Sequence, residues 1–292
     1  MRNKNEQNIR QKGRSQGAQI FHRVIRRTSV KISIAILVIL ALACIFAPYL
    51  TPYSYSQMIV KDRLQGSSLK HLMGTDDMGR DIFTRLLYGG RYSLRIGVEA
   101  VAASMLIGVA IGTVAGYFGG MVDNIIMRII DVLQSIPGLL FNIIIAATLG
   151  TGFVNTVIAL AFTSIWPYVR MMRAQVLSVR KMEYLEAASE INASTPRIMM
   201  RHLVPNCLSP IIVQATMGVG QAILIAAGLS FIGLGIQPPE PEWGAMLSAG
   251  RAYVRDYSYM VIYPGLFIGV TVLALNLIGD ALRDAMDPKL KS

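Results

Sequence analysis

Long apolar runs alternate with polar segments along this 292-residue chain. Six of the runs are close to or longer than the roughly 20 residues that a helix needs to cross a bilayer. Pro137 and Gly138 interrupt the third run, where they predict a break in the helix. We expect transmembrane helices at residues 30–50, 93–117, 124–149, 153–169, 207–235 and 259–279. The pattern therefore predicts an all-α membrane protein with six transmembrane helices.

Composition and charge support a membrane protein and predict its orientation. The chain is 53% hydrophobic and 15% charged, whereas soluble domains carry about 25% charged residues. Its net charge is +11, and its Lys and Arg residues cluster in the polar segments. The segments on the side of the two termini hold nineteen of them and the opposite side holds nine. This excess predicts that both termini lie in the cytoplasm. It also accounts for the net positive charge, so no binding of nucleic acid is needed to explain it.

Small and charged residues inside the spans suggest packing roles. Gly108, Gly112 and Gly116 recur every four residues in the second span, which favours close approach of another helix. Arg95 and Glu99 are four residues apart and are expected to pair at the outer interface; the alternative, a functional group inside the membrane, stays open. Arg128 and Asp131 can likewise neutralise each other, and Cys44 and Cys207 fit small core positions. In the fifth span, Gln214 and Gln221 share one helix face. They predict either a polar lining of a pathway or hydrogen bonds between helices.

Two polar segments lie on the expected outer side. Residues 51–92 should lie along the interface before the second span begins, with Asp76 or Asp77 capping a helix and Asp81 pairing with Arg85. Residues 236–257 hold a stiff proline cluster followed by an amphipathic helix.

The segment EYLEAASEINASTPRIMMRHLVPN, residues 183–206, lies between the fourth and fifth spans. It predicts two short helices with a corner at Asn192, a residue that tolerates the left-handed conformation. Ser194 or Thr195 can cap the second helix, and Pro205 should stop or bend it. Such a helix pair can form a rigid projection at the membrane surface.

The sequence lacks the common signatures of catalysis. It has no G-x-x-x-x-G-K-[ST] phosphate loop, no G-x-S-x-G and no H-E-x-x-H. Its three histidines (His22, His71 and His202) are scattered, so they indicate no metal site. We therefore expect a transport subunit without enzymatic activity, cofactor or metal, whose energy comes from a partner.

Three stretches resemble permease subunits of ABC importers in the dipeptide, oligopeptide and nickel family, and specifically the C-type permease of the pair. The first runs from Glu186-Ala187-Ala188 to Pro205 and resembles the EAA loop, with Asn192 and Val204 where the family usually has Gly and Leu. The other two are GTDDMGRD followed by RLLYGGRYSL, and FIGLGIQPPEPEWGAML. The resemblance covers nearly everything from the first span to the C-terminus.

The resemblance implies the type I ABC importer permease fold, with a cytoplasmic coupling helix and an external amphipathic segment. It also implies roles for particular residues. Residues expected to couple to the ATPases are Tyr184, Glu186, Ala187, Ala188, Asn192, Ala193, Arg197, His202 and Pro205. Pro239, Glu242 and Trp243 are expected to face a binding protein, and Gln214 and Gln221 remain candidates for the pathway. The implied partners are a homologous second permease, two ABC ATPases that hold ATP and Mg²⁺, a periplasmic or extracellular substrate-binding protein, and membrane lipid.

The expected organisation follows from these assignments. Residues 1–29 form a cytoplasmic tail, 30–92 the first helix with the external segment, 93–280 a five-helix core with the coupling loop at 182–206, and 281–292 a second cytoplasmic tail. The expected function is ATP-driven uptake of di- and oligopeptides across a bacterial cell membrane. Nickel or metallophore cargo is an alternative. A secondary transporter driven by an ion gradient is another, although it would usually need carboxylates near the midplane.

Overall fold

The computed structural model describes residues 24–183 and 194–286, and these residues are almost entirely helical. Apart from an isolated bridge between Thr75 and Asp81, the described residues form no β structure. The long helices are α3 (Thr28–Ile45), α5 (Ile82–Phe118), α6 (Gly120–Gln134), α7 (Gly138–Leu149), α8 (Phe153–Val179), α11 (Val204–Phe231) and α13 (Tyr259–Met286). Shorter elements are α4 (Ala47–Leu50), η1 (Val60–Asp62), α10 (Thr195–Arg197), η2 (Ile198–Leu203), α12 (Trp243–Gly250) and η3 (Arg251–Tyr253).

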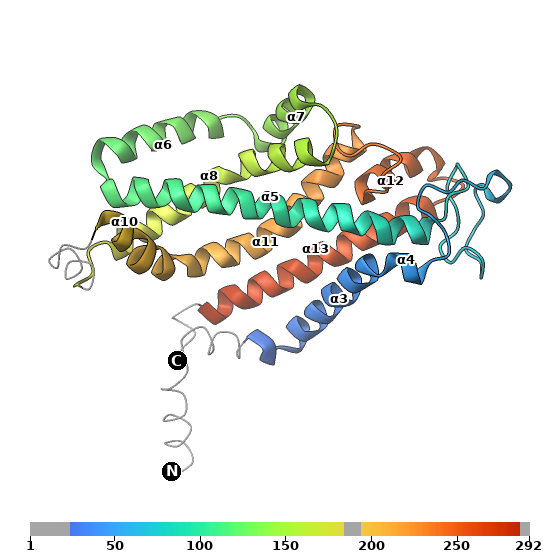
Figure 1. Cartoon of the computed structure of the whole chain (residues 1–292), viewed down its shortest axis with the longest axis horizontal. Coiled ribbons are helices and arrows are strands. Elements are labelled where there is room, and N and C mark those ends of the chain that lie inside the picture. Colours follow the sequence, from blue (N-terminus) through green and yellow to red (C-terminus); the bar gives the residue numbers. More distant parts are fainter. Residues whose placement is uncertain (1–23, 184–193, 287–292) are drawn as a thin grey trace, which may run out of the picture.

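The long helices form an elongated bundle (Figure 1). Helices α5, α8, α11 and α13 lie side by side, and α3 packs along α13. Residues 51–81 and α12 cover one end, which we call the outer cap, while α10 and the start of α3 lie at the other end. There Arg27 pairs with Asp284 at 2.6 Å, so the first and last described helices meet.

The expected glycine stripe is the contact between α5 and α8. A Cβ added to Gly108 would lie 2.5 Å from Cβ of Tyr168, and one added to Gly116 would lie 2.7 Å from Cβ of Val176. Gly112 faces α8 in the same way between them. The three glycines therefore let the two backbones approach at a distance that any larger residue would prevent.

By length and composition, four helical segments can cross a membrane: α3, α5, the continuous Thr195–Phe231 and α13. A fifth is added if α6 and α7 count as one span, since they are bent by 85° at the predicted Pro137 break. Helix α8, the expected fourth span, has 27 residues but falls outside this set. The six-span expectation is therefore matched by four or five segments on these criteria.

Two helices extend beyond their expected ends. Helix α5 begins at Ile82 because Asp81 caps it, accepting a hydrogen bond from the Thr84 backbone N–H at 2.8 Å. With this early start the helix has 37 residues. Residues 82–92 are therefore the first turns of α5, so the expectation that they precede the second helix was wrong, and the cap is Asp81, not Asp76 or Asp77. Helix α8 likewise continues past residue 169 to Val179.

Buried ion pairs organise the outer cap. Arg80 Nε donates to Asp76 Oδ2 at 2.6 Å, and Arg85 lies 3.7 Å from the same carboxylate. The Asp81 carboxylate instead contacts the buried ring of His71, at 3.0 Å from Nδ1. The expected Asp81–Arg85 pair was wrong because both side chains have partners outside the helix.

The helix before the fifth span does not stop at Pro205. Ser194 occupies the N-cap position of α10 without a side-chain cap bond, and a π-helical turn, η2, leads directly into α11. Pro205 closely follows this π-helical turn, and local π-helical adjustments of this kind let a membrane helix tolerate a proline. Cys44 and Cys207 are buried and free, as expected.

Candidate functional site

A cavity of about 770 Å³ lies among α5, α7, α8, α11 and α13. Both Gln214 and Gln221 line it, so the structure brings together the two glutamines that the sequence indicated. Their role in transport stays a prediction. The polar members of the lining are Asn142, Thr163, Ser164, Tyr168, Gln214, Gln221 and Asn276. All of them are uncharged, and the other lining residues are apolar, glycine or proline.

The sequence reasoning missed Asn142, which organises one wall of this cavity. Its side chain is buried, and its Oδ1 accepts a hydrogen bond from the Thr163 hydroxyl at 2.8 Å. Its Nδ2 donates to the Gly138 carbonyl at 3.0 Å. The bond to Thr163 holds α7 against α8 just after the Pro137 break, while the bond to Gly138 lies within α7 and fixes the orientation of the amide. A lone amide four residues after a Pro-Gly break, in an otherwise apolar run, was the signal that could have identified it.

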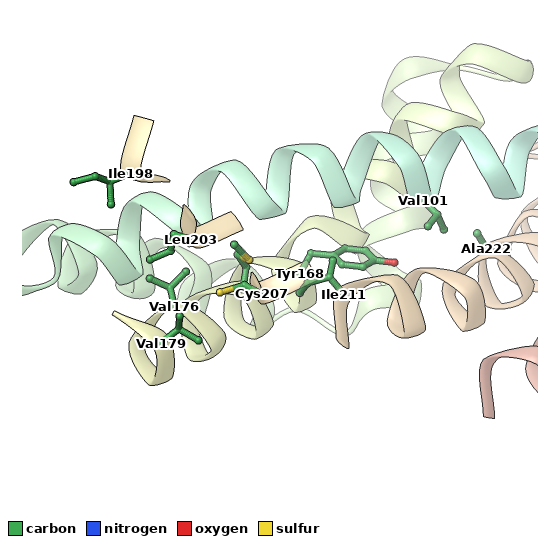
Figure 2. Packing of buried hydrophobic residues seen from close by; sticks show 10 residues of the cluster. Val101, Tyr168, Val176, Val179, Ile198, Leu203, Cys207, Ile211 and Ala222 are labelled. Carbon is green, nitrogen blue, oxygen red and sulfur yellow. The ribbon is translucent and has the colours of Figure 1, made fainter. Parts of the chain in front are cut away.

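Tyr168 forms a boundary between the cavity and the hydrophobic core. Its ring belongs to a buried cluster that includes Cys207 and Ile211 (Figure 2). In Figure 2 its hydroxyl points away from Cys207 and toward Val101 and Ala222, two further lining residues. The aromatic ring is thus packed in the core while its polar end faces the cavity side, which is the usual arrangement for a tyrosine.

The proposed external contacts at Glu242 and Trp243 are buried. Glu242 caps α12, accepting from the Ala245 backbone N–H at 2.9 Å, and also accepts from the Ser93 hydroxyl at 3.0 Å. Trp243 Nε1 donates to the Leu86 carbonyl at 2.9 Å. These bonds fasten α12 to α5, and the burial contradicts the expectation that these two side chains face a binding protein. Pro239 is exposed.

The structure describes some of the predicted coupling residues and not others. Tyr184, Glu186, Ala187, Ala188, Asn192 and Ala193 lie outside the described residues. Arg197 and Pro205 are exposed and His202 is half-buried. They lie on α10, α11 and η2 respectively, at the end of the bundle opposite the outer cap (Figure 1).

The charged residues near that end pair between helices. Asp131 on α6 accepts from Arg170 on α8 at 2.6 Å, so the expectation that it pairs with Arg128 was wrong. Asp123 accepts from Arg173 in the same pair of helices.

The Arg95–Glu99 pair at the outer end of α5 is confirmed, with the two side chains 2.9 Å apart and largely exposed.

The fold is that of a type I ABC importer permease. The chain is similar to a permease chain in an inward-facing crystal structure of the MetNI methionine ABC transporter, with a TM-score of 0.55 and 16% identity. The match covers 70% of this chain and 97% of that chain. At this identity the likeness shows the fold alone.

Sequence comparison defines the family. Residues 108–292 match the binding-protein-dependent transport system inner membrane component, and residues 15–66 match the N-terminal transmembrane domain of oligopeptide transport permease C. The dipeptide transport system permease protein DppC of Alkalihalophilus pseudofirmus is 47% identical over 86% of this chain and 83% of its own length. The glutathione transport system permease protein GsiD of Pectobacterium atrosepticum is 44% identical over 93% and 91%. The di/tripeptide permease DppC of Pseudomonas aeruginosa is 42% identical over 88% and 86%. The chain belongs to this family of ABC importer permeases and is a transport subunit of the peptide-importer type.

Proposed function

We propose that this chain forms half of the translocation pathway of an ATP-driven importer of di- and oligopeptides. The observation that carries the proposal is the 770 Å³ cavity with its uncharged amide and hydroxyl lining, in a chain of this permease family. A homologous second permease would supply the other half of the pathway. Transport would proceed as the two permeases rock against each other and open the pathway to alternate sides.

The lining favours peptides over a metal cargo. Asn142, Gln214, Gln221 and Asn276 carry amides that can both donate to and accept from a peptide backbone. Three relatives bear names that specify dipeptide, di/tripeptide or glutathione transport. Nickel and metallophore cargo remain alternatives, but the described residues hold no cluster of three or more His, Cys, Asp or Glu that could bind a metal.

The ATPases would contact residues 182–206, where Glu186 and its neighbours would transmit the closure of two ATPase subunits on ATP and Mg²⁺. The exposed Arg197 and Pro205 at that end support such a contact. The excess of Lys and Arg on the same side supports a cytoplasmic location for it and for both termini, in a bacterial cell membrane.

The outer cap would receive the substrate-binding protein. Leu69 is 100% exposed and Leu72 is 56% exposed in this segment, which also exposes Met58, Val60 and Met78. Pro239, three residues before the buried Glu242, is exposed as well. Apolar side chains left on an extramembrane surface favour contact with another protein. Leu69 and Leu72 therefore replace Glu242 and Trp243 as candidates for this contact.

Purification tests the assembly. The chain is expressed with its neighbouring genes, solubilised in detergent and isolated through a tag, and ATP hydrolysis is measured with and without binding protein and a dipeptide. We expect a second permease and ATPase subunits to co-purify, and the binding protein with dipeptide to stimulate hydrolysis. A lone chain indifferent to ATP would contradict the proposal and favour the gradient-driven alternative.

A further inference from the structure

Two ion pairs connect α6 to α8 at the end of the bundle that leads to residues 182–206. Arg173 Nε and Nη2 donate to the two carboxylate oxygens of Asp123 at 2.5 and 2.6 Å. Arg170 Nη2 donates to Asp131 Oδ1 at 2.6 Å. We call these two contacts the inner ion pairs. A bidentate arginine–carboxylate contact fixes orientation as well as distance, so the Asp123–Arg173 pair sets how α6 lies relative to α8.

Helices α6 and α8 share an apolar contact beside the inner ion pairs. Ile130 on α6 packs with Ile165, Trp166 and Val169 on α8 in a buried cluster. An open apolar groove of about 450 Å³ runs along α5, α6 and α8 next to this cluster, and its lining includes Ile126, Ile130 and Trp166. Apolar contacts are non-directional, so the inner ion pairs add the directional contacts that fix how α6 is oriented on α8.

Helix α6 leads directly to the wall of the transport cavity. It turns by 85° at Pro137 into α7, whose residues Gly138, Leu139 and Asn142 line that cavity. The Asn142–Thr163 hydrogen bond ties α7 back to α8 at the cavity wall. A movement of the inner end of α8 can therefore reach the cavity by two routes, through α8 itself and through α6.

We propose that the inner ion pairs make α6 follow α8, so that movement of α8 at the ATPase end displaces α7 at the cavity. Asp123 and Arg173 are then positioning residues for transport, although neither lines the cavity. Without the pair, α6 would no longer follow α8 and α7 would be moved only through its own contact with α8, so ATP would be hydrolysed with less cargo moved. The inference rests on the proposed function.

The test compares four complexes in proteoliposomes: the wild type, Asp123→Asn, the charge-swapped Asp123→Arg/Arg173→Asp, and the control Glu99→Gln. Glu99→Gln removes an ion pair of the same chemistry whose two members both lie in α5, and it leaves Arg95 in place to stack on Phe153 of α8. The readout is the amount of dipeptide taken up per ATP hydrolysed. We expect a fall of about 2- to 30-fold for Asp123→Asn, the range found when coupling networks are mutated. The control should leave the ratio unchanged, and the swap should restore part of it.

A second readout follows the two helices and does not depend on the cargo. Spin labels are placed at the exposed positions Asn124 and Ala174 as Asn124→Cys and Ala174→Cys, beside Asp123 and Arg173. Their distance is measured in the complex by pulsed electron paramagnetic resonance. We expect one narrow distribution in the wild type and a broader one in Asp123→Asn. If that variant does not assemble, Asp131→Asn removes the more exposed pair and gives the same comparison.

Each outcome separates the two proposals. An unchanged transport ratio and an unchanged distance in Asp123→Asn, with a wild type that transports dipeptide, would overturn the role of the inner ion pairs alone. An equal loss in Asp123→Asn and Glu99→Gln would overturn it as well. A wild-type complex that moves no peptide would contradict the proposed function, while the spin-label distances would still decide whether the pairs hold α6 to α8.

Discussion

Gly112 on α5 lies against the backbone of Val169 on α8: a Cβ added to this glycine would lie 2.5 Å from the Val169 carbonyl oxygen. Real Cβ atoms essentially never approach another heavy atom so closely. The neighbour is backbone and cannot rotate away, so any side chain at Gly112 must push the two helices apart. The cavity wall formed by α8 depends on this contact because Thr163 and Tyr168 lie on the same helix.

We therefore predict that Gly112→Ala destabilises the chain. Overpacking a tight contact costs about 1–3 kcal/mol, which should appear as a lower thermal midpoint in detergent. Gly269→Ala is the matched control, because nothing lies within 4 Å of a Cβ added there. A thermal midpoint for Gly112→Ala equal to that of the control would show that the α5–α8 contact is looser than the structure indicates.

The cavity lining gives a second prediction. Gln221→Leu should lower dipeptide uptake by about two- to tenfold, the effect of losing one hydrogen bond between neutral groups, while subunits still assemble. Thr216→Val is the control: it removes a polar side chain from α11 outside the cavity. Among the described residues, this hydroxyl donates to the Ile212 carbonyl of its own helix at 3.0 Å and to nothing else. Equal uptake by the two variants would argue against cargo contact at Gln221.

The outer cap gives a prediction about pH. The hydrogen bond from Lys70 to Asp62, 2.5 Å long, is the main reason that the pKa of Asp62 lies below its usual 3.8, and His71 adds to it. A carboxyl whose pKa is lowered by folding contributes stability above its unfolded pKa, and that contribution disappears as the pH falls through the folded value. The pair therefore stabilises the cap at neutral pH, and this stabilisation is lost progressively as the pH falls below 3.8 through the lower pKa of the folded state.

Thermal midpoints of the wild type and Lys70→Gln, measured from pH 7 down to pH 3, test this. The variant should be less stable at pH 7, and the difference should shrink below pH 3.8 as Asp62 takes up its proton. Lys61→Gln, an exposed lysine next to Asp62 in sequence, is the control and should match the wild type throughout. A difference between wild type and Lys70→Gln that does not depend on pH would rule out the Lys70–Asp62 pair as its cause.

The coupling loop gives a fourth prediction, for residues outside the described chain. Glu186→Lys should abolish dipeptide uptake while the protein still inserts and assembles, because it reverses the charge at the expected ATPase contact. Asn192→Gly should be tolerated, since glycine adopts the left-handed corner at least as readily. Normal uptake by Glu186→Lys would remove the coupling role, and loss of assembly in Asn192→Gly would indicate a specific contact of the asparagine side chain.

Periodic and local features of the molecule were predictable from the sequence. The apolar runs, the Pro137 break and the glycine stripe at Gly108, Gly112 and Gly116 depend on residues close in the chain. The Arg95–Glu99 pair was predictable for the same reason. Partners distant in sequence were not: Asp131 bonds Arg170, 39 residues away.

The same limitation explains the error at the outer face. No local pattern around Glu242 indicated that it would accept a hydrogen bond from Ser93, 149 residues earlier in the chain. Polar residues in a loop normally face water, and only the packing of α12 onto α5 buries this one. The cavity was partly predictable, because Gln214 and Gln221 share one helix face. The contribution of Asn142 required the 85° bend that brings α7 beside α8.

The central claim is that ATP drives peptide through this permease, and uptake into proteoliposomes tests it most directly. The complete complex is reconstituted with its binding protein outside, ATP or ADP inside, and a radiolabelled dipeptide added outside. We predict accumulation only with ATP and binding protein, unaffected by ionophores that collapse proton and sodium gradients. Accumulation that follows an imposed ion gradient without ATP would contradict the account.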